Sequence, residues 1–182
     1  GRSKVDVFES AVAEIALHEA ARLAKKGRRL INMDSQIPNR VAEEWIREGN
    51  LFPNASLIKP EKTYKQSRFD LYIEEENRKI FVEVKGVTLE YDGVARFPDA
   101  PTERGVKHLN GLKRALEEGH RAAAFFVIQM ENVKYLHPND TTDPVFGQAL
   151  REAAAAGVQV LAVDCTVTED TMTVKSPVEV QL

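Results

Sequence analysis

The chain has little cysteine and no long apolar segment. Cys165 is the single cysteine in 182 residues, so an internal disulfide is excluded, and no Cys/His cluster points to structural zinc. No apolar run approaches the roughly 20 residues that a membrane-spanning helix needs, and the first residues lack the apolar core of a secretory signal. We therefore expect a cytoplasmic protein with no membrane partner.

The composition is that of a globular domain, with 43% hydrophobic and 29% charged residues and no internal repeat or low-complexity linker. A length of 182 residues suits one domain with a sizeable core. The formal net charge of −3 argues against a broadly basic nucleic-acid-binding protein. The basic residues nevertheless gather in three clusters, within residues 22–29, 59–68 and 104–114. These clusters are either solvated surfaces or local contacts for nucleic acid.

Two segments in the first third have the apolar spacing of amphipathic helices, residues 5–26 and residues 40–48, with a short strand at 29–33 between them. Glu43 and Glu44 lie next to each other in the second helix. Successive helical residues diverge by about 100°, so at most one of these two carboxylates points along a given direction. Both are solvated acids, or one of them is a further acid near a metal.

The rest of the chain alternates strands and helices. We predict a strand at 56–64 bent at Pro60, an irregular loop at 90–101, a helix from Thr102 to Glu118, a strand at 121–130, a helix from Asp143 to Ala156, a strand at 158–163 and a terminal strand or hairpin within 167–182. Antiparallel strands followed by strand–helix alternation indicate an α/β fold with a mixed central β-sheet flanked by helices.

A strand pair at 67–73 and 79–86, joined by a polar turn, carries the main candidate site. Side chains alternate along a strand, so Glu83 and Lys85 point the same way. If the hairpin pairs so that Asp70 faces them, two carboxylates and an ammonium group meet at one place. The alternative is a cross-strand cluster of charges on a solvated sheet face.

Two carboxylates beside a lysine suit metal-dependent hydrolysis of a phosphodiester. Asp70 and Glu83 would hold Mg²⁺ or Mn²⁺, with the carbonyl of Val84 as a third ligand and Glu43 or Glu44 as a weaker candidate. Lys85 would hold the attacking water or stabilise the charged phosphate. The sequence thus predicts a nuclease site of the Asp…Glu-x-Lys type.

Further polar residues lie where they could reach this site. Gln129 follows the apolar strand of residues 125–128 and either reaches the same sheet edge or caps the strand end. Arg104 and His108 share a helix face at four-residue spacing and either contact phosphate or are solvated.

Several long motifs resemble the sugar fermentation stimulation protein (SfsA) family: Ile37–Arg40, Ser67–Asp70, Val82–Leu89, Phe97–Leu109 and Gly157–Val158. The resemblance implies a restriction-endonuclease-like domain with a PD-(D/E)xK-type site and DNA binding without sequence preference. Family members have also been linked to regulation of sugar (maltose) metabolism. The candidate nucleic-acid-binding residues within these motifs are Arg68, Arg104, Lys107 and His108.

The resemblance covers residues 28–182, which we expect to form the nuclease-like domain, whereas the predicted helix within residues 1–27 has no match in the family. The family carries an N-terminal OB-like β-barrel domain, and no all-β segment of that kind is present among these 182 residues. Two functions remain open, a metal-dependent nuclease and a non-catalytic DNA-binding regulator. Sugar binding is a third hypothesis that rests on the family name alone. The sequence leaves both a monomer and a homo-oligomer open.

Overall fold

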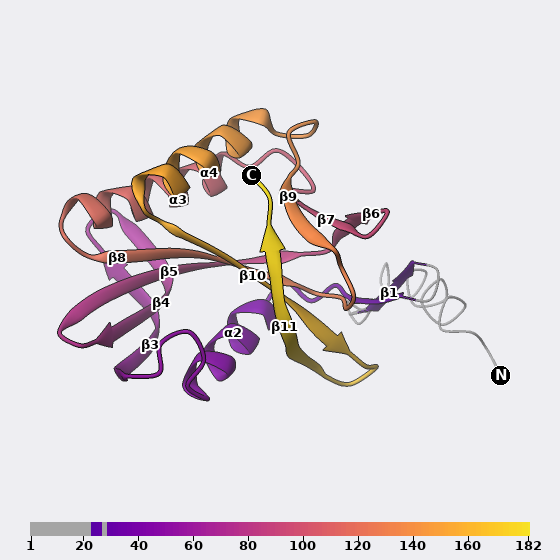
Figure 1. The fold of residues 1–182 in the computed structure, drawn as a ribbon, viewed down its shortest axis with the longest axis horizontal. Helices are drawn as coiled ribbons and strands as arrows, with labels where there is room; N and C mark the ends of the chain where they lie inside the picture. Colours follow the sequence, from indigo (N-terminus) through magenta and orange to yellow (C-terminus); the bar gives the residue numbers. More distant parts are fainter. Residues whose placement is uncertain (1–22, 27–28) are drawn as a thin grey trace.

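A nine-stranded mixed β-sheet with helices on both faces forms the body of the protein (Figure 1), in a computed structural model that describes residues 23–26 and 29–182. In sheet order the strands are β3 (Ala55–Tyr64), β4 (Ser67–Glu75), β5 (Arg78–Val87), β8 (Arg121–Ile128), β10 (Gln159–Val167), β11 (Met172–Val180), β9 (Tyr135–Pro138), β7 (Val94–Phe97) and β6 (Leu89–Tyr91). The helices are α2 (Ile37–Arg47), α3 (Glu103–Glu117) and α4 (Pro144–Ala156). The predicted fold class is confirmed. No helix in the described part of the chain is long and apolar enough to cross a membrane.

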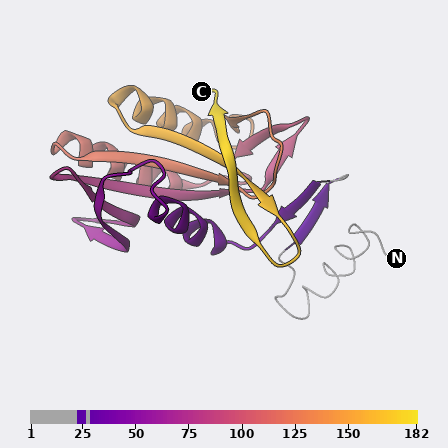
Figure 2. The same ribbon diagram turned by 60° about the horizontal axis from the view of Figure 1, so that its bottom comes forward.

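The helices divide the core into two layers. α3 and α4 cover one face of the sheet and α2 covers the other (Figures 1 and 2). Along β8, Phe125 packs in the layer under α2, and Phe126 packs in the layer under α3 and α4. Both side chains are fully buried. The apolar run that predicted a strand covered on both faces therefore has a structural explanation.

Two side chains start the helices of the second half. Thr102 Oγ1 accepts a hydrogen bond from the N–H of Gly105 (2.9 Å), and Asp143 Oδ1 accepts one from the N–H of Phe146 (3.0 Å). Asp143 Oδ2 also accepts from the N–H of Thr102 (2.8 Å), so the two helix N-termini share one junction. The parallel neighbours β5, β8 and β10, connected through α3 and α4, form the predicted β-α-β-α-β stack.

The first described residues differ from the prediction. Residues 23–26 form strand β1 (Leu23–Lys26), which pairs with β2 (Arg29–Asn32), so a helix over these four residues is wrong; residues 5–22 of that prediction lie outside the described residues. Helix α2 begins at Ile37, three residues earlier than expected, because Pro38 fits the first helical turn, where no N–H bond is needed.

The region predicted as an irregular loop, residues 90–101, contains a second hairpin instead. Strands β6 and β7 pair across Asp92 and Gly93, which both have positive φ (52° and 84°). That pair of conformations makes the two-residue turn that Asp-Gly favours. Strand β9 was also not predicted, and it joins β7 to β11 and completes the sheet.

Candidate functional site

The hairpin of β4 and β5 places the candidate acids at its open end. Glu76 and Asn77 both have positive φ, which gives a two-residue turn tighter than the predicted one. The register pairs Leu71 with Val82, which is the last pair of the ladder at this end of the hairpin. The next residues along each strand are Asp70 and Glu83, so the two acids face each other where the ladder opens.

Strand β4 is irregular at Asp70. Phe69 packs under α3 and α4, whereas Leu71 packs under α2, although residues two apart in a regular strand share a face. The neighbouring strand β3 is irregular at the same level, because Glu61 lies between the pairs on either side of Asp70 and has φ of 54°. Asp70 therefore belongs to neither core layer and is available to a cavity.

The Asp70 carboxylate is held at both oxygens. Oδ2 accepts a hydrogen bond from the N–H of Val84 (2.7 Å), and Oδ1 accepts one from Asn39 Nδ2 (3.2 Å) at the start of α2. Burial, followed by the nearby Glu83 carboxylate, raises the pKa of Asp70 to about 6. The folded chain thus disfavours the negative charge unless a cation balances it.

Glu83 is the most deeply buried member of the site, at 3% exposure. Its Oε1 lies 2.7 Å from Nδ1 of His108 and 3.5 Å from Nζ of Lys85. The lysine Nζ lies 2.9 Å from the same ring nitrogen. Glu83 Oε2 is buried and has no hydrogen-bond partner among the described residues. A buried carboxylate oxygen without a partner is rare and costly, which makes it a candidate ligand atom.

A cavity of about 630 Å³ opens over these acids. The predicted nucleic-acid-binding residues Arg68, Arg104, Lys107 and His108 line it together with Asp70 and Glu83. His108 also lies 3.4 Å from Nε of Arg104 through its second ring nitrogen. The structure therefore gathers Asp70, Glu83 and the candidate phosphate-binding side chains around one opening. Lys85 does not line this cavity, but its Nζ contacts Glu83 and His108.

Other predicted residues are placed differently. Glu43 lines an adjoining cavity with Asp70, but its carboxylate accepts two hydrogen bonds from Arg47. Glu44 is exposed and lines neither cavity. Val84, expected to offer a carbonyl ligand, contacts Asp70 through its N–H.

Gln129 caps a strand rather than lining the cavity. Its Nε2 donates to the backbone oxygens of Asn32 and Asp34 (both 2.9 Å), which fixes the chain just before α2. A Cβ at Gly86 would lie 2.5 Å from Gln129 Oε1 and 2.7 Å from Pro38 Cγ, so a larger residue beside Lys85 would displace these side chains. Gln129 thus contacts the segment that leads into α2, the helix that carries Asn39.

Sequence reasoning missed two contacts of the candidate site. Asn39 lies inside the motif Ile37–Arg40, and that motif was the signal that could have identified it. The contact of His108 with Glu83 left no local signal, because it depends on how α3 packs on β5. The described residues contain no group of three His, Cys, Asp or Glu side chains that could hold a metal. A cation at Asp70 and Glu83 would need backbone, amide or solvent oxygens to complete its ligands.

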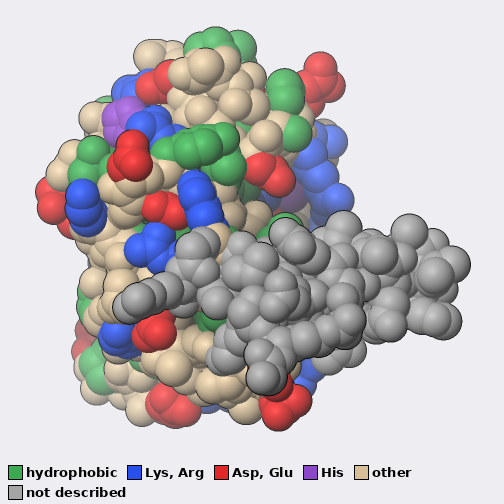
Figure 3. Space-filling model, turned by 90° about the vertical axis from the view of Figure 1, so that its right-hand side faces the viewer, with side chains coloured by type: hydrophobic (Ala, Val, Ile, Leu, Met, Phe, Trp, Pro, Cys, Tyr) green, Lys and Arg blue, Asp and Glu red, His purple; other side chains and the backbone are tan. Residues whose placement is uncertain are grey.

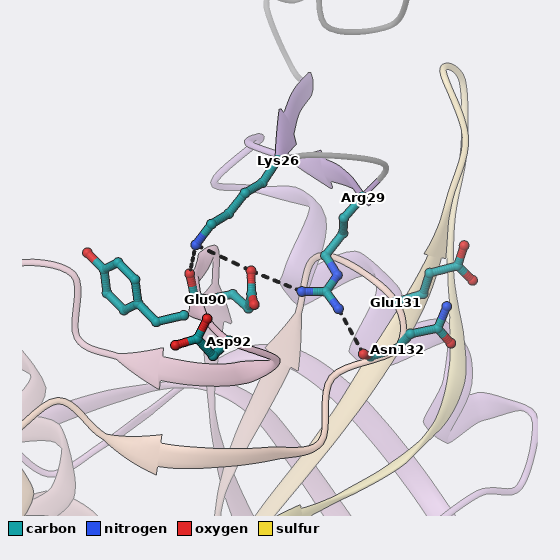
Figure 4. A pocket seen from close by; sticks show the side chains of 7 residues that line it. Lys26, Arg29, Glu90, Asp92, Glu131 and Asn132 are labelled. Atoms are coloured by element: carbon teal, nitrogen blue, oxygen red, sulfur yellow. Dashed lines mark hydrogen bonds and ion pairs between the residues drawn. The ribbon is translucent and has the colours of Figure 1, made fainter.

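A larger cavity, of about 760 Å³, lies between the β1–β2 and β6–β7 hairpins (Figure 4). Glu90 at its floor is 6% exposed and meets Arg29 Nη1 (3.0 Å), Lys26 Nζ (3.4 Å) and the N–H of Gly93 (2.5 Å). Burial raises the pKa of Glu90, but these donors outweigh it and leave that pKa below its usual range. Acidic and basic side chains are interspersed on this side of the molecule (Figure 3). We interpret this cluster as one that stabilises the fold by joining the β1–β2 and β6–β7 hairpins.

The fold and the site together define an α/β domain in which an acid–acid–lysine cluster lies at the end of a β-hairpin. The family model described as "Sugar fermentation stimulation protein RE domain" matches residues 36–171. The sugar fermentation stimulation protein homologue of Clostridium beijerinckii is 54% identical over 157 residues, which are 86% of this chain and 70% of the relative. The homologue of Ruminiclostridium cellulolyticum is 52% identical over 157 residues, with the same shares. The chain belongs to the sugar fermentation stimulation protein (SfsA) family.

A solved structure has the same fold. Pyrococcus furiosus SfsA in complex with Ca²⁺ superposes with a TM-score of 0.82 at 26% identity, covering 88% of this chain and 71% of that one. The resemblance seen in the sequence motifs is confirmed at the level of the family.

Proposed function

We propose that this chain binds DNA and hydrolyses its phosphodiester bonds at a divalent-metal site formed by Asp70 and Glu83. The observation that carries the proposal is the buried Oε2 of Glu83, which lacks a partner within the described residues and lies beside a carboxyl whose pKa is raised to about 6. A hard divalent cation, Mg²⁺ or Mn²⁺, would supply the missing counter-charge. The Ca²⁺ bound by the Pyrococcus relative supports a divalent ion.

The side chains around this pair have separate roles. A bound metal would neutralise charge on the phosphate and activate water. Lys85, whose Nζ lies 3.5 Å from Glu83 Oε1, would stabilise the charged phosphate or hold the water. His108, in contact with both Glu83 and Lys85, keeps the two side chains together. Arg68, Arg104 and Lys107 around the same cavity would bind backbone phosphates, which carry no sequence information.

A second function is a non-catalytic DNA-binding regulator linked to sugar (maltose) metabolism. The family description, which names stimulation of sugar fermentation, favours it. In that case the acids and the metal would anchor a phosphate without turnover, and binding would be salt-dependent and tolerant of sequence. Either function belongs in the cytoplasm, where DNA is accessible.

Cleavage of supercoiled plasmid with Mg²⁺ or Mn²⁺ tests the first function. We expect nicking by the wild type and a loss of at least about 100-fold in rate for Glu83→Ala and for Lys85→Ala. Lys79→Ala, on the same strand with an exposed side chain, is the matched control and should cut normally. Cleavage that survives both site substitutions contradicts this mechanism. Binding without cleavage by folded wild type favours the regulator.

A further inference from the structure

A second, smaller cavity of about 240 Å³ adjoins the site. It is lined by Tyr64, Lys65, Gln66, Ser67, Gly111, Arg114 and Glu118. Gln66 and Ser67 line both this cavity and the one over Glu83. The two cavities therefore meet across the turn between β3 and β4.

One face of α3 forms a wall of both cavities. Arg104, Lys107, Gly111 and Arg114 recur at intervals of three or four residues, so they share a helix face. Arg104 and Lys107 line the cavity over Glu83, and Gly111 and Arg114 line the cavity of about 240 Å³. A Cβ at Gly111 would lie 2.6 Å from Ser67 Oγ, so glycine lets the β3–β4 turn approach the helix closely.

The smaller cavity combines cations with a fixed aromatic ring. Lys65 and Arg114 are exposed, and Lys65 Nζ lies 5.8 Å from the centre of the Tyr64 ring. That ring is held against Phe81, at 4.6 Å between centroids, and Glu118 contacts both Tyr64 and Lys65. Basic grooves with an ordered aromatic ring are the recurring features of sites for single-stranded nucleic acid.

We propose that this groove, from the cavity over Glu83 to the cavity beside Gly111, carries an unpaired DNA strand. The inference rests on the proposed function. Phosphates would follow Arg104, Lys107, Arg114 and Lys65, and the base of one nucleotide would enter the cavity beside Gly111 against Tyr64. In a duplex the bases are stacked inside and cannot reach such a cavity, so the groove favours a single strand.

Fluorescence anisotropy in EDTA tests the groove without involving metal or cleavage. The probes are a labelled 12-nucleotide single strand and a duplex of the same sequence. We expect Lys65→Ala/Arg114→Ala to bind the single strand about tenfold more weakly, with a salt slope shallower by about 1.4 because two phosphate contacts are lost. Duplex binding should weaken less. Arg78→Ala/Lys79→Ala removes two exposed cations at the other end of the β4–β5 hairpin and should match the wild type.

Each outcome separates the two proposals. Wild-type affinity and slope in Lys65→Ala/Arg114→Ala, or equal weakening in the control pair, overturns the groove and leaves the nuclease proposal standing. If Lys65→Ala/Arg114→Ala binds the single strand more weakly but the wild type never cuts plasmid, the groove is supported and the nuclease proposal is contradicted. Absence of wild-type binding at low salt overturns the groove and the DNA-binding function together.

Discussion

Glu83 and Glu90 are both buried glutamates on the same sheet, yet their surroundings differ. Glu90, at 6% exposure, is bonded to a backbone N–H and two cationic side chains. Glu83, at 3% exposure, shares one oxygen with His108 and Lys85, while its other oxygen has no partner in the described part of the chain. A buried acid with all its donors in place stabilises a fold, whereas one with an unpartnered oxygen reduces stability until a ligand binds. Burial alone therefore does not identify a functional acid.

The largest expected effect is on stability without metal. Glu90→Ala should lower the free energy of unfolding by about 3 kcal/mol, because it leaves Arg29 and the Gly93 N–H without their acceptor. Glu83→Ala should be close to neutral or stabilising in EDTA. Urea unfolding of the two variants and the wild type in EDTA measures both. Equal losses in the two variants would remove the distinction between these glutamates.

With metal present, Glu83 rather than Glu90 should be the glutamate on which the gain in stability depends. Ca²⁺ or Mn²⁺ at about 100 times its Kd should stabilise the wild type by about 2.7 kcal/mol, since only the folded state holds Asp70 and Glu83 together. Glu90→Gln should keep this increment and Glu83→Gln should lose it. Thermal unfolding with and without the ion gives the comparison. A shift that persists in Glu83→Gln places the ion elsewhere.

The smallest effect is a pH dependence at Asp70. Its folded pKa of about 6 lies above the ordinary value of 3.8, so the unfolded state loses this proton first as pH rises. Stability falls between about pH 4 and pH 6, and the loss is complete above the folded pKa. Asp70→Asn should therefore be more stable than the wild type by about 1–2 kcal/mol at pH 7.5 in EDTA and equal to it at pH 3.5. Melting temperatures across this range measure the difference, and a constant gap at all pH values would contradict the assignment.

Local signals predicted the elements that local contacts determine. Thr102 and Asp143 were predicted to begin helices, and each does so through its own side chain. The helix predicted over residues 23–26 was wrong. The apolar spacing of a helix continues through these residues, but Lys26 contacts Glu90, 64 positions away in the chain, and a local pattern cannot encode such a contact. The β6–β7 hairpin could have been predicted, since Asp92-Gly93 is a strong turn signal.

The candidate site divides in the same way. Alternation along β5 correctly placed Glu83 and Lys85 together, and the hairpin register brought Asp70 beside them. The ring of His108 and the amide of Asn39 come from two helices on opposite faces of the sheet. Their approach to the acids depends on tertiary packing, which no spacing in the sequence encodes.

The interrupted pairing of β3 and β4 at Glu61 and Asp70 has a consequence for evolution in the laboratory. Glu61 holds a left-handed backbone conformation that costs energy in a residue other than glycine. Glycine at position 61 would relieve this cost, and Asp70→Asn would remove a carboxylate whose charge the fold disfavours. Selection for thermal stability alone would therefore favour loss of the acid and of the irregular backbone beside it, at the expense of the candidate site.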